Sequence, residues 1–405
     1  MVTLQEVQFM PPIYLDHAAT TPLDRRVREA MEPYLTDVFG NPSSIHRQGQ
    51  QARMAVDGSR ETVAWMLGAA ATEIVFTGGG TEADNAAIYG VAWANRDRGR
   101  HIVTSAIEHE AVLEASAYLE SQHDFEVSRV MPGSEGIVSV ADIEAALRPD
   151  TVLVSVMYAN NEIGTIQPVG DIGLLCRSRG VLFHVDAVQA VGTIPVDVGR
   201  DTIDLLSLSA HKFYGPKGVG ALYVRSGIHW WPSQLGGGQE RRRRSGTENV
   251  AGIVGMAKAL SLACESMDET STRIVELRNH LIEAACSAVP EIGLNGDPDR
   301  RLPGNANLRF PGVQGESMVT ALDTLGIMVS TGSACASGSV EPSHVLRALG
   351  DSNAEARSAV RVTIGRQNTR EEVDSAVRSI VEVYRRLRDS GVARPGMLQP
   401  VAASR

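Results

Sequence analysis

Short apolar segments alternate with helical stretches between about residues 70 and 225, and this alternation constrains the fold more than any other feature. The segments include Ile102–Thr104, Thr151–Met157 and Gly220–Val224. Strands separated by helices form a mainly parallel sheet with helices packed on it. The chain has 405 residues, whereas single cores seldom grow beyond about 250–300 residues. The sequence therefore predicts an α/β protein with two domains.

Other segments indicate how the rest of the chain is organised. Thr21 and Pro22 predict the start of an amphipathic helix, with Thr21 as its cap. A helical region near 248–288 leads to the strand Ala306–Phe310 and a final helix over about 371–388. We expect a large domain over 16–265, a small domain over 1–15 and 266–390 with a loop at about 330–341, and a flexible tail over 391–405.

Composition excludes several classes of protein. The formal net charge of -10 argues against general nucleic-acid binding, and the run Arg241–Arg244 is interpreted as a local salt-bridge or interface feature. Four cysteines without paired spacing argue against a disulfide scaffold and a metal site. No apolar run approaches the roughly 20 residues of a membrane span, and Met1–Glu6 lacks the features of a signal peptide. We therefore expect a cytoplasmic protein that binds neither metal nor membrane.

A lysine follows one of the predicted buried strands. The strand Asp204–Leu208 leads into Ser209–Lys212, with Gly215 and Gly218 close behind. A lysine at the end of a strand can point into a cleft, where a deprotonated amine forms a Schiff base with an aldehyde. Taken alone, a lysine such as Lys212 is more often a solvated loop residue.

A carboxylate ends a neighbouring predicted strand, Val181–Asp186, and an amide follows at Gln189. An aspartate at this point can pair with a protonated pyridine nitrogen, the contact that makes pyridoxal phosphate (PLP) an electron sink. Gln189 could hydrogen-bond the phenolic oxygen of the same cofactor. Capping of the following helix is the alternative role for Asp186.

A glycine-rich turn offers a place for the phosphate of that cofactor. Ile74–Asp84 reads as a strand, the turn Gly78–Gly80 and a helix start, with Thr81 adding a hydroxyl. Backbone N–H groups and the positive end of a helix attract anions. The turn matches neither the P-loop pattern nor the full dinucleotide spacing, so by itself it is a weak signal.

Cys335 lies between Gly332 and Gly338 among small residues, a composition that predicts a mobile loop. A thiolate is a strong nucleophile, and an amine together with a thiol suggests chemistry on an amino acid that contains sulfur. The alternative for Cys335 is a small buried core residue. Three other cysteines lie in apolar helical stretches and are interpreted as core residues: Cys176, Cys264 and Cys286.

In chain order, these segments resemble the cysteine desulfurases of the NifS/IscS type, group I, in the aminotransferase class V branch of fold-type I PLP enzymes. The resemblance implies the PLP-dependent transferase fold of type I: a large domain with a mainly parallel seven-stranded sheet covered by helices, plus a smaller α+β domain. Ala210 and Ala336 replace residues that are more often Gly and Thr in the family, which bears on partner preference more than on chemistry. The matching segments are Tyr14–Thr21, Gly40–Ser44, Glu108–His109, Asn160–Gly164, His184–Gln189, Ser209–Lys212, Arg244–Thr247, Gly332–Ser337 and Arg361–Gly365.

The resemblance also implies roles for individual residues. Lys212 would hold PLP, Asp186 would face the pyridine nitrogen, and His109 would stack on the ring. Gln189 and Asn161 would contact the ring oxygen and the substrate side of the cofactor. The implied phosphate contacts are Gly80, Thr81, Ser209, His211 and Thr247 of the partner subunit. The implied substrate contacts are Asn161, Asn41 and Arg361, whose guanidinium suits a carboxylate.

The activity implied by the resemblance converts L-cysteine to L-alanine. Lys212 or His109 would remove the α proton, and Cys335 would take the sulfur as a persulfide. A homodimer would then pass the sulfur to an acceptor protein, such as an iron–sulfur scaffold or an enzyme that thiolates tRNA, DNA or cofactors.

Two other classes of protein remain as alternatives. A selenocysteine lyase or an aminotransferase would share Lys212 and Asp186, although an aminotransferase has no need of Cys335. A scaffold or sulfur carrier without catalysis would have no need of Lys212, Asp186, His109 and Arg361.

Overall fold

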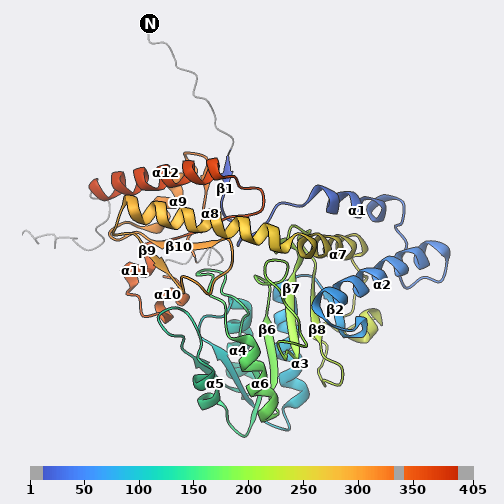
Figure 1. Ribbon diagram of the computed structural model, residues 1–405. Coiled ribbons are helices and arrows are strands. Elements are labelled where there is room, and N and C mark those ends of the chain that lie inside the picture. Colours follow the sequence, from blue (N-terminus) through green and yellow to red (C-terminus); the bar gives the residue numbers. More distant parts are fainter. Residues whose placement is uncertain (1–11, 333–341, 391–405) are drawn as a thin grey trace, which may run out of the picture.

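The computed structural model of the protein describes residues 12–332 and 342–390, and its largest sheet has seven strands (Figure 1). The strands lie in the order β2-β8-β7-β6-β5-β3-β4. Every neighbouring pair is parallel except the two pairs that β8 makes, with β7 and with β2. The predicted seven-stranded, mainly parallel sheet is therefore confirmed. Its strands are β2 (Ile74–Thr77), β3 (His101–Ser105), β4 (Glu126–Val130), β5 (Thr151–Ser155), β6 (Leu182–Asp186), β7 (Leu205–Ser209) and β8 (Gly220–Val224).

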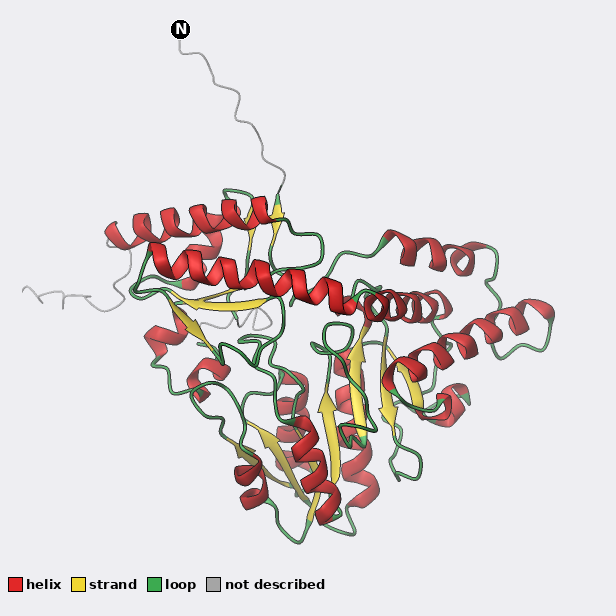
Figure 2. Ribbon diagram, viewed as in Figure 1, coloured by secondary structure: helices red, strands yellow, loops and turns green. Residues whose placement is uncertain are grey.

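Helices cover both faces of this sheet (Figure 2). Most of its strands are therefore buried on both sides. One face packs against α3 (Gly80–Asn95) and α4 (Glu110–Gln122). The other face packs against α2 (Arg47–Leu67), α6 (Val169–Arg179) and α7 (Val250–Glu265). Outside these lie α1 (Arg25–Thr36), which contacts α7, and α5 (Val140–Ala146), which contacts α6.

A second core forms around an antiparallel sheet in the order β12-β10-β9. The helices α8 and α12 lie side by side over it (Figure 1), and rings such as Phe310 and Tyr384 fill the space between the layers. A parallel pair, β1 with β11, extends this part of the molecule. The elements are β1 (Ile13–Tyr14), α8 (Met267–Ala288), β9 (Gly293–Asn295), β10 (Asn305–Arg309), α9 (Gly315–Asp323), β11 (Ile327–Met328), α10 (His344–Ala348), α11 (Asn353–Arg357), β12 (Ala359–Thr363) and α12 (Arg370–Asp389).

The chain bends by 72° between α7 and α8. This bend lets α7 pack on the large sheet while α8 joins the second core. The expected domain boundary after residue 265 falls at the bend and stays a prediction, as do the other boundaries. Within the described ranges no single helix has the length and apolar character of a membrane span; only these two bent helices, counted together, meet both criteria.

The first helix does not begin where the sequence predicted. It begins at Arg25, and Asp24 caps it by accepting a hydrogen bond from the backbone nitrogen of Arg26 at 2.7 Å. Thr21 is not a cap, because its hydroxyl donates to the carbonyl of His211 at 2.9 Å and accepts from the backbone nitrogen of Tyr214 at 2.8 Å. The segment before α1 is thus fastened to the turn that carries Lys212.

Candidate active site

A cavity of about 350 Å³ opens at the carboxyl ends of β5, β6 and β7. These strands are parallel, so the residues that follow them meet at one edge of the sheet, the usual position of ligand sites in such folds. The expected residues that line the cavity are Gly80, Thr81, His109, Asn161, Asp186, Gln189, Ser209, His211, Lys212 and Arg361.

Two of the expected residues in the described chain do not line this cavity. Asn41 and Thr247 are exposed and lie outside its lining. Cys335 falls outside the described residues, so its expected role stays a prediction. The other cysteines are partly or fully buried, as the core interpretation requires.

Lys212 reaches the cavity from the 3-10 turn Ala210–Lys212, which follows β7 directly. Its Nζ donates to the carbonyl oxygens of Ala18 at 2.6 Å and Ala19 at 2.9 Å. These carbonyls hold the amine at the cavity wall. The hydrogen bond of Gln189 Nε2 to Ala18, at 3.0 Å, fixes the same segment from the other side.

Asp186 ends β6 with a buried carboxylate in the cavity. One of its oxygens accepts from the backbone nitrogen of Val188 at 2.9 Å. Burial raises the pKa of Asp186, whereas His109 and Lys212 lower it. A cation that entered the cavity beside Asp186 would stabilise the ionised form in the same way.

A second buried carboxyl, Asp84, lines the cavity and was not expected from the sequence. Burial, followed by the charge of Asp186, raises its pKa well above the ordinary value. Its Oδ1 atom is buried without a hydrogen-bond partner and lies 3.6 Å from Nε2 of His184. Its position in the first turns of α3, directly after the glycine turn, was the only available signal in the sequence.

The start of α3 forms the part of the cavity suited to an anion. A Cβ atom on Gly80 would lie only 2.7 Å from Cγ2 of Val188, so only glycine lets the turn approach this closely. The first N–H groups of a helix have no partners within the helix and attract negative charge. Nδ1 of His211 lies 3.1 Å from the hydroxyl of Thr20, and burial lowers the pKa of His211 to about 4. His211 is therefore a neutral hydrogen-bonding group at neutral pH.

His109 caps α4 at the rim of the cavity. Its Nδ1 atom accepts from the backbone nitrogen of Ala111 at 3.1 Å. A neutral ring that accepts at Nδ1 carries its proton on Nε2. His109 is thereby set to donate a proton at Nε2.

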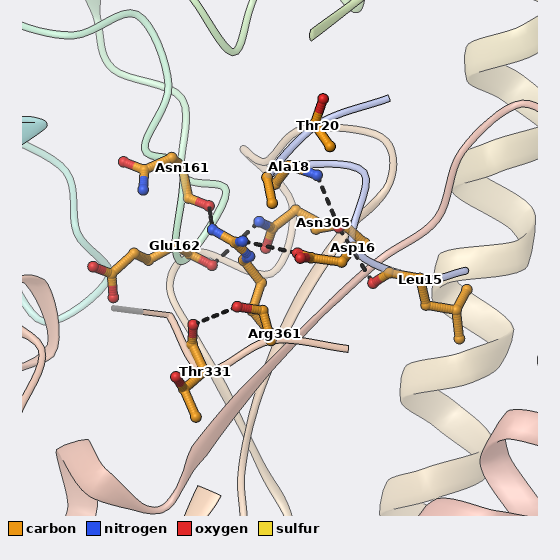
Figure 3. A network of polar contacts seen from close by, with 12 residues as sticks. Leu15, Asp16, Ala18, Thr20, Asn161, Glu162, Asn305, Thr331 and Arg361 are labelled. Atoms are coloured by element: carbon orange, nitrogen blue, oxygen red, sulfur yellow. Dashed lines mark hydrogen bonds and ion pairs between the residues drawn. The ribbon is translucent and has the colours of Figure 1, made fainter. Parts of the chain in front are cut away.

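Arg361 lies opposite, on β12, with a buried side chain (Figure 3). Its Nη1 donates to the carbonyl of Asn161 at 2.9 Å, and its Nη2 lies 2.9 Å from Oδ1 of Asp16. The Nε atom is buried without a hydrogen-bond partner. Two neighbours thus fix the guanidinium in the cavity, where it can bind a carboxylate.

The donor set of the cavity fits PLP. It combines an amine for the aldehyde, a buried carboxylate for the pyridine nitrogen and a helix start for the phosphate. Oδ1 of Asp84, close to Asp186, is buried without a hydrogen-bond partner. Such an orphaned group is typical of a site that a bound molecule completes. Lys212, Asp186 and Gly80–Thr81 would hold the cofactor in this arrangement.

Comparison with known proteins agrees with the fold and the cavity. The model of the family "Aminotransferase class-V" matches residues 13–376. The chain therefore belongs to the aminotransferase class-V family, whose members are PLP enzymes.

Similar proteins narrow the assignment within this family. "Cysteine desulfurase IscS" of Methanosarcina thermophila is 49% identical over 383 residues, which are 95% of this chain and 94% of that protein. A solved "NIFS-LIKE PROTEIN" is 39% identical with a TM-score of 0.87, over 93% of this chain and all of that one. The structure "SspA in complex with cysteine" is 38% identical with a TM-score of 0.78, over 88% of this chain and 100% of that one. Within its family the chain belongs with the cysteine desulfurases, so the predicted family and fold are confirmed.

Proposed function

We propose that this protein is a cytoplasmic, homodimeric desulfurase that holds PLP in the cavity, converts L-cysteine to L-alanine and passes the sulfur to Cys335. The observation that carries the proposal is the meeting of Lys212, Asp186 and Arg361 in one cavity of about 350 Å³. An amine, a buried carboxylate and a fixed guanidinium are the groups that such chemistry on an amino acid requires. The class-V family and the similarity to cysteine desulfurases support the same reaction.

The cofactor would supply an electron sink for negative charge on the carbon that bears the amino group. Asp186 would maintain the positive charge on its ring nitrogen, since a buried carboxylate gains most from an opposite charge nearby. The N-terminus of α3, Thr81 and the neutral ring of His211 would bind its phosphate.

Arg361 orients the substrate. Its guanidinium is already fixed by Asp16 and the carbonyl of Asn161, so little conformational freedom is lost when a carboxylate binds. With the carboxylate held there, the α carbon of cysteine lies between Arg361 and Lys212 in the cavity.

Lys212 and His109 divide the proton transfers. We assign removal of the α proton to Nζ of Lys212, because Nδ1 of His109 is occupied by the N–H of Ala111. His109 would then act as a donor from Nε2 toward the three-carbon fragment that keeps the electron pair of the broken C–S bond. The carbonyls of Ala18 and Ala19 keep Nζ in place between these steps.

Cys335 would complete the reaction as the sulfur acceptor. Its thiolate attacks the substrate sulfur, forming an S–S bond while the C–S bond breaks. The electron pair of the C–S bond stays with the three-carbon fragment, which is protonated and leaves as alanine. The terminal sulfur would then pass to a nucleophilic group of an acceptor protein, such as an iron–sulfur scaffold or a thiolation enzyme.

Exposed apolar side chains support the proposed homodimer. Phe39 and Ile45, in the segment between α1 and α2, are 75% and 94% exposed, and such exposed apolar side chains often mark interaction sites. Asn41 lies between them, and Thr247 is also exposed. We propose that Thr247 contributes to the phosphate site of a second copy of the chain, and Asn41 to a substrate site.

The reaction is tested by incubating the PLP-loaded protein with L-cysteine and a reductant without oxygen. Wild type should release alanine and sulfide in equal amounts, whereas Lys212→Ala and Cys335→Ala should release neither. Cys264→Ala, which changes a partly buried cysteine of α7, serves as the matched control and should keep full activity. Full activity of Cys335→Ala, or activity of wild type only on another amino acid, would contradict the proposal.

A further inference from the structure

The carboxylate of Glu162 lies where the described chain stops before Cys335 and where it resumes after it. Its Oε2 atom accepts a hydrogen bond from the hydroxyl of Ser343 at 2.6 Å. A Cβ atom on Gly332 would lie 2.4 Å from the same Oε2 atom and 3.1 Å from Cδ. One buried oxygen therefore contacts both flanks of residues 333–341.

The backbone of Glu162 is held from two directions. Its N–H donates to Oδ1 of Asn160 at 2.8 Å, and Asn160 in turn donates to the carbonyl of Ile107 at 2.8 Å. Its carbonyl accepts from the side-chain amides of Asn305 and Asn307, each at 3.2 Å. The carboxylate consequently has a fixed position relative to both sheets.

On the far flank, the hydroxyl of Ser343 serves two purposes. It accepts from the backbone nitrogen of Leu346 at 3.2 Å and so caps α10, while its proton is donated to Glu162. Nε2 of the next residue, His344, lies 2.9 Å from the carbonyl oxygen of Glu108, directly before His109. The start of α10 is thereby tied to the rim of the cavity.

On the near flank, the chain is paired with the proposed carboxylate-binding arginine. The backbones of Ser330 and Arg361 exchange hydrogen bonds of 3.1 and 2.7 Å. Gly332 itself lines the cavity, and Figure 3 shows Glu162 beside Asn161 and Arg361. Both flanks are therefore set relative to the groups that orient the substrate.

Burial raises the pKa of Glu162, and three neighbours lower it: Ser343 through its hydrogen bond, and His344 and Arg361 through their charges. With these neighbours, the buried carboxyl group keeps an oxygen that accepts strongly from the hydroxyl of Ser343. An unpaired glutamate in the same place would be costly.

We propose that Glu162 is a positioning residue for sulfur transfer, because it fixes both ends of the segment that carries Cys335 relative to the cavity. The inference rests on the proposed function and deepens it. Glu162 is not among the described residues that line the cavity, and it acts through Ser343 and Gly332.

The test compares Glu162→Ala with Glu162→Gln, whose amide oxygen still accepts from Ser343. Glu73→Ala is the matched control, because Glu73 also joins two segments through its carboxylate. That carboxylate accepts from the backbone nitrogens of Ser226 at 2.7 Å and Ala70 at 2.9 Å. The rate of persulfide formation on Cys335 after one addition of L-cysteine should fall about ten- to a hundred-fold in Glu162→Ala, as expected for a displaced reacting group. It should stay near wild type in Glu162→Gln and Glu73→Ala, and the cysteine-induced absorbance change of the holoenzyme should be kept in all three.

Hydrogen exchange gives a readout that does not depend on activity. The amides of Ser330 and Leu346, bonded to Arg361 and Ser343, should exchange faster in Glu162→Ala and at the wild-type rate in Glu162→Gln. Exchange that is unchanged in Glu162→Ala would overturn the inference whether or not the enzyme is active.

A substitution at Gly332 tests the contact from the other side. Gly332→Ala places a Cβ atom 2.4 Å from Oε2 of Glu162 and should slow persulfide formation. In the double variant with Glu162→Ala, the nearest remaining atom to that Cβ is the Cβ of residue 162, at 3.4 Å. Gly332→Ala should then add no further loss, which is the coupling expected of two groups in contact.

A wild-type persulfide rate in Glu162→Ala, or an equal loss in Glu162→Gln, would overturn the positioning role. Failure of the wild type itself to form a persulfide would instead contradict the proposed function, and the exchange experiment would still decide the role of Glu162.

Discussion

Arg60 of α2 and Glu240 form an ion pair that is almost entirely shielded from water, with side chains 5% and 3% exposed. Nη1 and Nη2 of Arg60 lie 2.6 and 2.7 Å from the two carboxylate oxygens of Glu240. The backbone nitrogen of Phe76 donates to Oε2 of Glu240 at 3.0 Å. The pair thus fastens the turn before Arg244–Thr247 to β2, the strand that leads into the glycine turn of the cavity.

Replacing Glu240 with alanine leaves two buried donors without their acceptor: the guanidinium of Arg60 and the N–H of Phe76. Breaking a buried ion pair costs about 3–5 kcal/mol, and an unsatisfied buried N–H costs about 1–3 kcal/mol. The two effects share one site and do not add fully. We expect Glu240→Ala to lower the free energy of unfolding by about 3–6 kcal/mol.

The matched control breaks an exposed pair. Glu29→Ala removes the partner of Arg25 on α1, where the side chains are 54% and 83% exposed, and should change the free energy of unfolding by less than about 1 kcal/mol. Urea titration at a fixed PLP concentration gives both values by linear extrapolation. A loss in Glu240→Ala no larger than that in Glu29→Ala would refute the reasoning.

Three further predictions concern backbone strain, pH dependence and substrate binding. Arg242 has a positive φ of 67° on an exposed turn, so Arg242→Gly should raise the free energy of unfolding by about 1 kcal/mol in urea titration, and a decrease would contradict this. Burial raises the pKa of Glu108 from 4.5 to about 8. As the pH rises from 4.5 to 8, the unfolded chain loses this proton while the folded protein keeps it, so the free energy of unfolding falls. Glu108→Gln removes that fall, and its unfolding free energy relative to wild type should increase between pH 5 and pH 8; an unchanged difference would contradict the assignment. Arg361→Lys keeps the charge but loses the fork that contacts Asn161 and Asp16, so kcat/KM for L-cysteine should fall roughly ten- to a hundred-fold in steady-state assays, whereas a wild-type value would contradict the role of Arg361.

The residues whose positions could be predicted from the sequence are those at the ends of strands. Asp186 ends β6 and Lys212 follows β7 by one turn, so recognising the parallel strands was enough to bring them to one edge. Gly80 and Thr81 could be placed for the same reason, since they follow β2 and begin α3. Local pattern and sheet topology together determine these positions.

The contacts that could not be predicted join distant segments of the chain. The carbonyls of Ala18 and Ala19 bind Lys212 across more than 190 residues, and Asp16 reaches Arg361 across 345. Thr21 fails as a helix cap because such a long-range contact, to His211, competes for its hydroxyl. Periodicity and local propensity contain no information about pairings of this kind.

Asn41 and Thr247 illustrate a second limit, because one chain leaves both exposed and outside its own cavity. The role proposed for Thr247 would need a second copy of the protein. The exposed apolar side chains of Phe39 and Ile45 in the structure support such a copy.

The central claim is that this cavity removes sulfur from cysteine and delivers it to Cys335. Peptide mass spectrometry after one addition of L-cysteine to the PLP-loaded enzyme, with alanine measured in the same sample, tests it most directly. The account predicts one added sulfur atom on the peptide that contains Cys335, in proportion to the alanine formed, and neither product in Lys212→Ala. Alanine formed without added sulfur on Cys335, or with the sulfur on another cysteine, would contradict it.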